Sequence, residues 1–70
     1  MPKLPVLTSK KLIKILKSYG FIEHHQTGSH KILFNPEKEL RVTVPFHVRD
    51  LPKGTTAAIL NQAKIDRHSL

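Results

Sequence analysis

One histidine, His30, lies in a sequence context that suits proton transfer. His30 follows Gly28 and Ser29 and opens an apolar, strand-forming run that ends at Phe34. An imidazole has an ordinary pKa of about 6.5, so it can take or give a proton near neutral pH. The chain contains no cysteine, which excludes thiolate zinc sites, disulfides and a cysteine nucleophile.

RNA cleavage is one of the reactions that an imidazole can catalyse. RNA carries a 2′-hydroxyl beside each phosphate, so cleavage requires only that this proton be removed, the phosphorane stabilised and the leaving oxygen protonated. No metal is obligatory. Gly28 lacks a Cβ, so the turn can take a positive φ and a phosphate backbone can approach closely. Lys31 and Arg41 are candidates to hold phosphates. DNA lacks the 2′-hydroxyl, so this mechanism predicts no DNase activity.

The other histidines have simpler explanations, and His30 has one too. The two-residue period of a strand places His30 on the side of Ile32 and Phe34, so a partly buried structural histidine also fits the pattern. His47 is a candidate accessory residue that could protonate the leaving group or bind phosphate, although a histidine in a loop is often ordinary. In a strand the side chains of the adjacent His24 and His25 would point to opposite faces, so the two histidines could not bind one metal ion together. We predict no metal site.

The charge of the chain favours a polyanionic partner. The chain of 70 residues contains twelve Lys and Arg and five Asp and Glu, which gives a formal net charge of +7. Lys10, Lys14 and Lys17 form a stripe with no acidic residue before Glu23. Like charges four residues apart disfavour a helix, so this stripe is predicted to bind RNA; the alternative is a solvated helix face.

Two helices and three strands are expected to position these residues. A helix should run from Thr8 or Ser9, as its N-cap, to about residue 19, where Gly20 ends it and Phe21 packs back on the last turn. Its apolar stripe is Leu12, Ile15, Leu16 and Tyr19. The segments 21–26, 29–34 and 39–45 read as strands bounded by turn residues.

A second amphipathic helix is expected within 51–64, with Asp50 as the plausible N-cap. Its stripe is Thr56, Ile59, Leu60 and Ala63. Tyr19, Phe21 and Phe34 are assigned to the core, which leaves Phe46 as the one candidate platform for base stacking. The result is an α+β fold of order α-β-β-β-α, with a three-stranded antiparallel sheet and two helices on one face, as in a double-stranded-RNA-binding domain. Residues 1–70 read as one domain.

Four motifs in this order carry a resemblance to a known family. They are "YGF" at the end of the first helix, "GSH" opening the second strand, "VPFH" closing the third strand, and then "LPKGTTAAILNQAKI" in the second helix. Together they resemble the HicA family of bacterial toxins over about residues 12–65.

The resemblance implies a toxin of a toxin-antitoxin system that cleaves mRNA independently of the ribosome and without a cofactor. It also implies a cognate HicB-like antitoxin that covers the active site, and it makes His30 the catalytic histidine, with Gly28, Ser29 and His47 as accessory candidates. A non-catalytic RNA-binding module of the same fold remains the alternative. No apolar stretch approaches a membrane span, so we expect a cytoplasmic protein.

Overall fold

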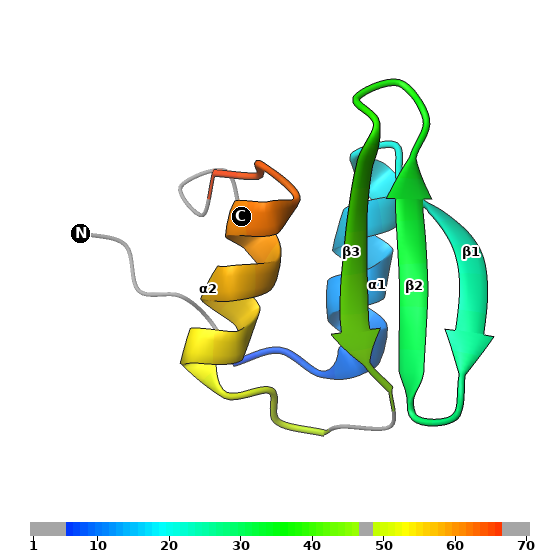
Figure 1. Ribbon diagram of the computed structural model, residues 1–70. Helices are drawn as coiled ribbons and strands as arrows, with labels where there is room; N and C mark the ends of the chain where they lie inside the picture. The colour runs from blue at the N-terminus through cyan, green and yellow to red at the C-terminus, as the bar shows by residue number, and fades with distance from the viewer. Residues whose placement is uncertain (1–5, 47–48, 67–70) are drawn as a thin grey trace.

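The computed structural model describes residues 6–46 and 49–66. These residues follow the predicted α-β-β-β-α order (Figure 1). The elements are helix α1 at Ser9–Ser18, strands β1 at Ile22–Thr27, β2 at His30–Asn35 and β3 at Leu40–Pro45, and helix α2 at Lys53–Gln62. The strands form one antiparallel sheet in the order β1-β2-β3, so the predicted α+β architecture is confirmed.

Helix α1 begins and ends where the sequence predicts. The Thr8 hydroxyl oxygen accepts a hydrogen bond from the Lys11 N–H at 3.1 Å and so caps the first turn. At the other end Gly20 has a φ of +95°, and the Phe21 N–H donates to the Leu16 carbonyl at 3.1 Å. This is the Schellman arrangement, and it turns the chain out of the helix and into β1.

The turn between β1 and β2 consists of Gly28 and Ser29, with Thr27 opposite His30 in the ladder. Gly28 has a φ of +55° at the first central position of this turn, where a residue with a Cβ is strained. A Cβ added to Gly28 would have no atom within 4 Å. The backbone angle therefore explains the glycine, and the space beside the turn is open.

The turn between β2 and β3 is organised by Asn35, whose side chain is buried. Its Oδ1 accepts hydrogen bonds from the N–H groups of Glu37 and Lys38, at 3.0 and 3.1 Å. Its Nδ2 donates to the Tyr19 carbonyl at 3.2 Å. One amide thus ties the end of α1 to the far end of the sheet.

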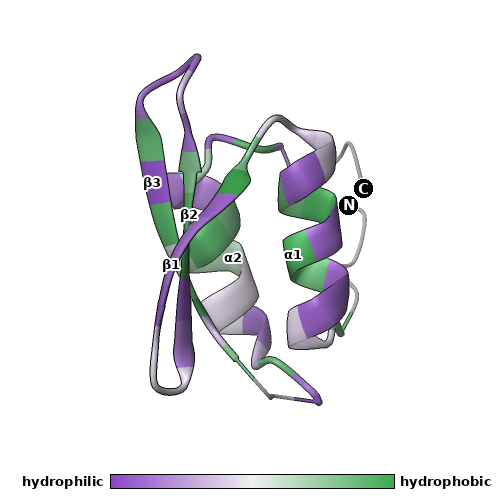
Figure 2. Ribbon diagram, turned by 90° about the vertical axis from the view of Figure 1, so that its right-hand side faces the viewer, coloured by the Kyte–Doolittle hydropathy of each residue, from purple (hydrophilic) through white to green (hydrophobic). Residues whose placement is uncertain are grey.

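Helix α1 lies against one side of the sheet, and α2 lies beside the edge formed by β3. Figure 2 views the sheet nearly edge-on, with α1 to its right, and Figure 1 shows α1 behind the sheet and α2 beside β3. Apolar side chains from both helices, from β2 and from β3 form the core between these layers. Its members are Leu7, Leu12, Ile13, Leu16, Phe21, Leu33, Val42, Val44, Leu51, Ile59, Leu60, Ala63 and Ile65. The side of the sheet away from α1 stays open.

Three details of the sequence prediction were wrong. Tyr19 is 37% exposed, because α1 turns Ile13 toward the sheet instead. Phe34 is only partly buried, because the register that buries Leu33 directs its neighbour in β2 to the open side. The N-cap of α2 is Pro52, since the helix begins at Lys53, too far along for the predicted Asp50. The buried stripe predicted for α2 is confirmed.

Candidate active site and basic groove

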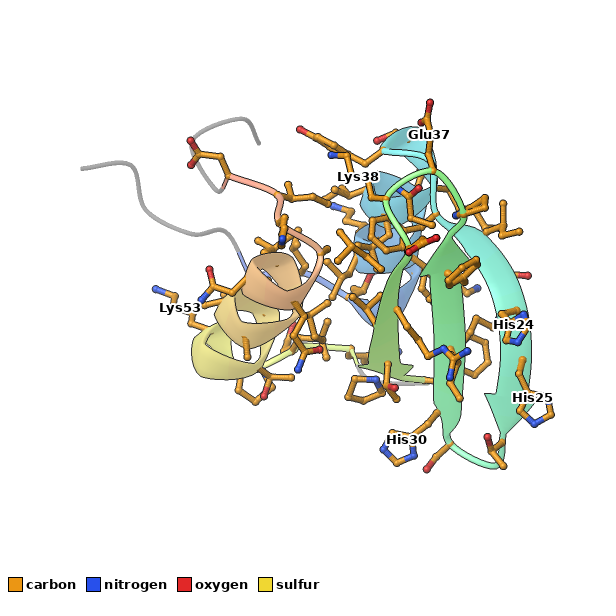
Figure 3. The ribbon with its side chains drawn as sticks, turned by 45° about the horizontal axis from the view of Figure 1, so that its top comes forward. His24, His25, His30, Glu37, Lys38 and Lys53 are labelled. Atoms are coloured by element: carbon orange, nitrogen blue, oxygen red, sulfur yellow. The ribbon has the colours of Figure 1, made fainter. Side chains whose placement is uncertain are left out.

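His30 is the first residue of β2 and lies at the end of the sheet where the turn between β1 and β2 is located (Figure 3). In the ladder it opposes Thr27 of β1 and Pro45 of β3. It shares the open side with Ile32 and Phe34, as the sequence predicts. However, its side chain is exposed, so the partly buried structural histidine that this period suggested is not what the structure has.

A shallow hollow of about 500 Å³ lies between His30 and α2. His30, Thr43 and Pro45 form the sheet side of this hollow. Its helix side is formed by Gly54, Thr55, Ala58, Ile59 and Gln62. Of the described residues that line it, none is Lys or Arg, and Lys53 extends away from His30 (Figure 3). We call this the His30 hollow.

The N-terminus of α2 gives the His30 hollow a partial positive charge, although no Lys or Arg is among the described residues that line it. Its first intrahelical bond runs from the Thr56 N–H to the Pro52 carbonyl at 3.0 Å, so the preceding N–H groups lack helical partners. No side chain caps them, and the first turn contains no acidic residue. A helix N-terminus of this kind attracts anions such as phosphate.

Two short hydrogen bonds fix the turn that carries His30. The Phe46 N–H donates to the Ser29 carbonyl at 2.6 Å, which extends the pairing of β2 and β3 beyond Pro45. The Ser9 hydroxyl donates to the Pro45 carbonyl at 2.6 Å and joins the start of α1 to the same point. The sequence suggested Ser9 only as a possible cap, because a bond spanning 36 residues leaves no local pattern.

On the opposite side of the sheet, α1 and the sheet enclose an open groove of about 320 Å³. The α1 side is a single stripe at i, i+3, i+4 and i+7, and the sheet side is formed by one residue each from β1 and β2 and by Phe46. We call this the basic groove. Its lining residues are Lys10, Ile13, Lys14, Lys17, Glu23, Lys31 and Phe46.

Glu23 is the acidic residue of the basic groove. Its Oε1 lies 2.9 Å from Lys31 Nζ and 3.2 Å from Lys17 Nζ. These two ammonium groups, Lys31 first, lower the pKa of the Glu23 carboxyl below its ordinary value of 4.5. Lys31 Nζ also lies 4.6 Å from the centre of the Phe46 ring. Sequence reasoning missed Glu23, since the pairing depends on the β1-β2 register.

The structure divides the candidate residues between these two places. Gly28 and Ser29 adjoin His30 in the turn. The four candidate RNA-binding lysines meet in the basic groove, so Lys31 lies on the other side of the sheet from its neighbour His30. Arg41 opposes Phe34, four residues along β3 from the partner of His30, and does not line the His30 hollow. His47 lies outside the described residues.

The two histidines of β1 differ from the sequence prediction. A bulge between Glu23 and His25 breaks the alternation of the strand. His25 opposes Ile32, and the His24 ring lies 6.1 Å from the Phe34 ring, so both belong to the open side. Figure 3 shows both imidazoles pointing outward. Within residues 6–46 and 49–66, no three His, Asp or Glu side chains are grouped so that they could hold a metal ion.

Comparison with known families identifies the chain. Residues 9–65 match the family described as the HicA toxin of bacterial toxin-antitoxin systems. The chain belongs to the HicA family. A search of curated proteins gave no significant match. The HicA match spans every helix and strand that the structure describes, and with them the His30 hollow and the basic groove. No helix among the described residues is long and apolar enough to cross a membrane.

Proposed function

We propose that this HicA family protein is a metal-independent endoribonuclease that cleaves mRNA with His30 as its proton-transfer group. The observation that carries this proposal is the exposed imidazole of His30 in a hollow that also contains the uncapped N-terminus of α2. An open hollow admits a polymer, and the imidazole and the amide groups supply the two things that transphosphorylation requires: proton transfer and stabilisation of negative charge.

The proposed reaction begins with the scissile phosphate at the first turn of α2. His30 removes the proton from the adjacent 2′-hydroxyl, and the 2′ oxygen attacks phosphorus. The extra negative charge of the phosphorane is stabilised by backbone N–H groups around Gly54, where the missing side chain leaves open space. The bond from phosphorus to the 5′ oxygen then breaks, that oxygen takes a proton from water, and the hydroxide so formed takes the proton held by His30. The products are a 2′,3′-cyclic phosphate and a 5′-hydroxyl.

A non-catalytic RNA-binding module is the second candidate, and one observation favours it. Of the described residues that line the His30 hollow, His30 is the one ionisable side chain, whereas the basic groove gathers four lysines. In that case RNA would bind by charge alone, and His30 would have no chemical role.

Cleavage of a defined single-stranded RNA in excess chelator distinguishes the two candidates. We expect the purified protein to cut the RNA and leave 2′,3′-cyclic phosphate ends. General acid–base catalysis contributes about 10²- to 10⁴-fold, so His30→Ala should lose a factor of that order. His25→Ala is the matched control, since it removes another exposed imidazole from the same side of the sheet, and it should cleave normally.

Two results would contradict the enzyme proposal. One is cleavage by the folded His30→Ala variant at the rate of the parent. The other is RNA binding without cleavage by the parent, which would establish the binding module.

The partner we propose is the cognate antitoxin of the toxin-antitoxin pair, a HicB-like protein that covers His30. The formal charge of +7 favours an acidic partner surface and rapid, salt-sensitive association. A complex with the antitoxin should therefore protect RNA from cleavage.

A further inference from the structure

The basic groove contains a carboxylate where a row of lysines would otherwise be free. Lys10, Lys14 and Lys17 follow one another along α1 over about 10 Å at 1.5 Å per residue. Lys31 faces them from β2, and a single oxygen of Glu23 contacts both Lys17 and Lys31. One anionic oxygen shared by two ammonium groups is also the arrangement that a phosphate oxygen would make.

These contacts can be exchanged at little cost. The side chains of Lys17 and Glu23 are 50% and 42% exposed, and ion pairs as exposed as this contribute little to stability. Lys31 is held more firmly, at 14% exposure between Glu23 and the Phe46 ring, so its ammonium group is already in position. An incoming phosphate can therefore replace the carboxylate while Lys31 loses little freedom.

The basic groove begins close to the His30 hollow. Phe46 lines the groove, and its N–H is bonded to the carbonyl of Ser29, the residue before His30. A strand of RNA that leaves the His30 hollow at the end of the sheet can thus continue along α1. A groove between a helix and a sheet admits one backbone, whereas duplex RNA is contacted across successive minor grooves over about 16 base pairs.

We propose that the basic groove binds the single-stranded RNA backbone beside the cleaved phosphate, and that Glu23 is an internal competitor which this backbone displaces from Lys17 and Lys31. The proposal rests on the proposed function, since it extends the path of the substrate beyond His30. Glu23 then sets the RNA affinity below what the lysines alone would give. Because its pKa lies below the ordinary value of 4.5, the Glu23 carboxyl is ionised, and so competes, at neutral pH and well into mildly acidic solution.

The test is binding of a 2′-O-methyl oligonucleotide, which has no free 2′-hydroxyl and cannot be cleaved by this mechanism. Fluorescence anisotropy at several salt concentrations gives the affinity and its salt dependence. Glu23→Gln keeps the size of the side chain and removes its charge. We expect it to tighten binding by about three- to tenfold at low salt. Release of two lysines should steepen the salt slope by up to about 1.4, at about 0.7 for each phosphate contact.

Glu37→Gln is the matched control, because it changes the net charge equally from the turn between β2 and β3, outside the basic groove. It should alter the affinity by less than about twofold. Equal effects of the two variants would overturn the proposal, since net charge alone would explain them. Weaker binding by Glu23→Gln would also overturn it, because Glu23 would then support the site.

Two further arms identify the occupant. A duplex oligonucleotide should show a smaller gain from Glu23→Gln than the single strand, and an equal gain would overturn the single-strand assignment. A larger gain with a poly-glutamate peptide would overturn the proposal in favour of a protein partner. Because the assay involves no cleavage, it can be repeated in the His30→Ala background, so failure of the histidine chemistry and failure of the groove are separable.

Discussion

The His30 hollow and the basic groove lie on opposite sides of the same strand and differ in kind. The His30 hollow holds an imidazole and helix amides but, among its described lining residues, no basic side chain. The basic groove holds four lysines and one carboxylate but no histidine among its described lining residues. The first is equipped for proton transfer and the second for binding a polyanion.

The difference arises from the simplest property of a strand. His30 and Lys31 are neighbours in β2, so their side chains point to opposite sides of the sheet. The Ser9 and Phe46 hydrogen bonds then hold the chain at the end where the two places come closest. Proton transfer and charge can thus be altered separately, although they depend on one strand.

The largest expected effect is a loss of folding stability when the core packing of β2, the strand that both places share, is removed. Leu33 is fully buried in β2, the strand that carries both His30 and Lys31. Leu33→Ala should lower the free energy of unfolding by about 2–5 kcal/mol through lost packing and a cavity. That is a large part of the about 4–10 kcal/mol that a domain of this size has. Urea denaturation followed by circular dichroism measures the loss.

Ile32→Ala is the control for this prediction. It also truncates an aliphatic side chain of β2, but on the open side, where Ile32 is only partly buried. Its loss should be less than half that of Leu33→Ala. Equal losses would mean that the two sides of the sheet are not the distinct surfaces described above.

The smallest expected effect is the pH dependence of the Glu23 contacts. The folded-state pKa of Glu23 is lowered by Lys31 and Lys17, so its ionised form stabilises the fold. That contribution is present above the unfolded-state pKa and is lost as the pH falls through the folded value. The parent should be slightly more stable than Glu23→Gln at pH 7, and the difference should shrink as the pH falls below 4.5 and disappear once the Glu23 carboxyl is protonated in the folded state. A difference that grows on acidification would contradict these contacts.

Most of the fold could be predicted from the sequence, because the patterns that specify its helices and turns are local. The Thr8 cap, the Gly20 ending, the turn residues around β2 and the stripe of α2 each act within a few residues. The failures concern orientation and register. Tyr19 and Phe34 fit an apolar period, yet the rotation of α1 and the register of β2 place Ile13 and Leu33 in the core instead.

The candidate sites could be predicted only in part, because some of their contacts join separate elements of the fold. The motif around His30 and the lysine stripe of α1 are local, so the sequence indicated both. The roles of Ser9, Glu23 and Asn35 depend on contacts between separate elements, and local spacing carries no trace of them. The distance of Arg41 from His30 likewise depends on the β2-β3 register, whereas the separation of Lys31 from His30 follows from the alternation of a strand.

The most direct test of the central claim is the single-turnover cleavage rate as a function of protein concentration, for His30→Ala and for the combined Lys10→Gln, Lys14→Gln, Lys17→Gln variant. His30→Ala should lose the rate at saturation and keep the parent's half-saturating concentration. The lysine variant should do the reverse. If both variants lose the same quantity, the separation of proton transfer from RNA binding is wrong.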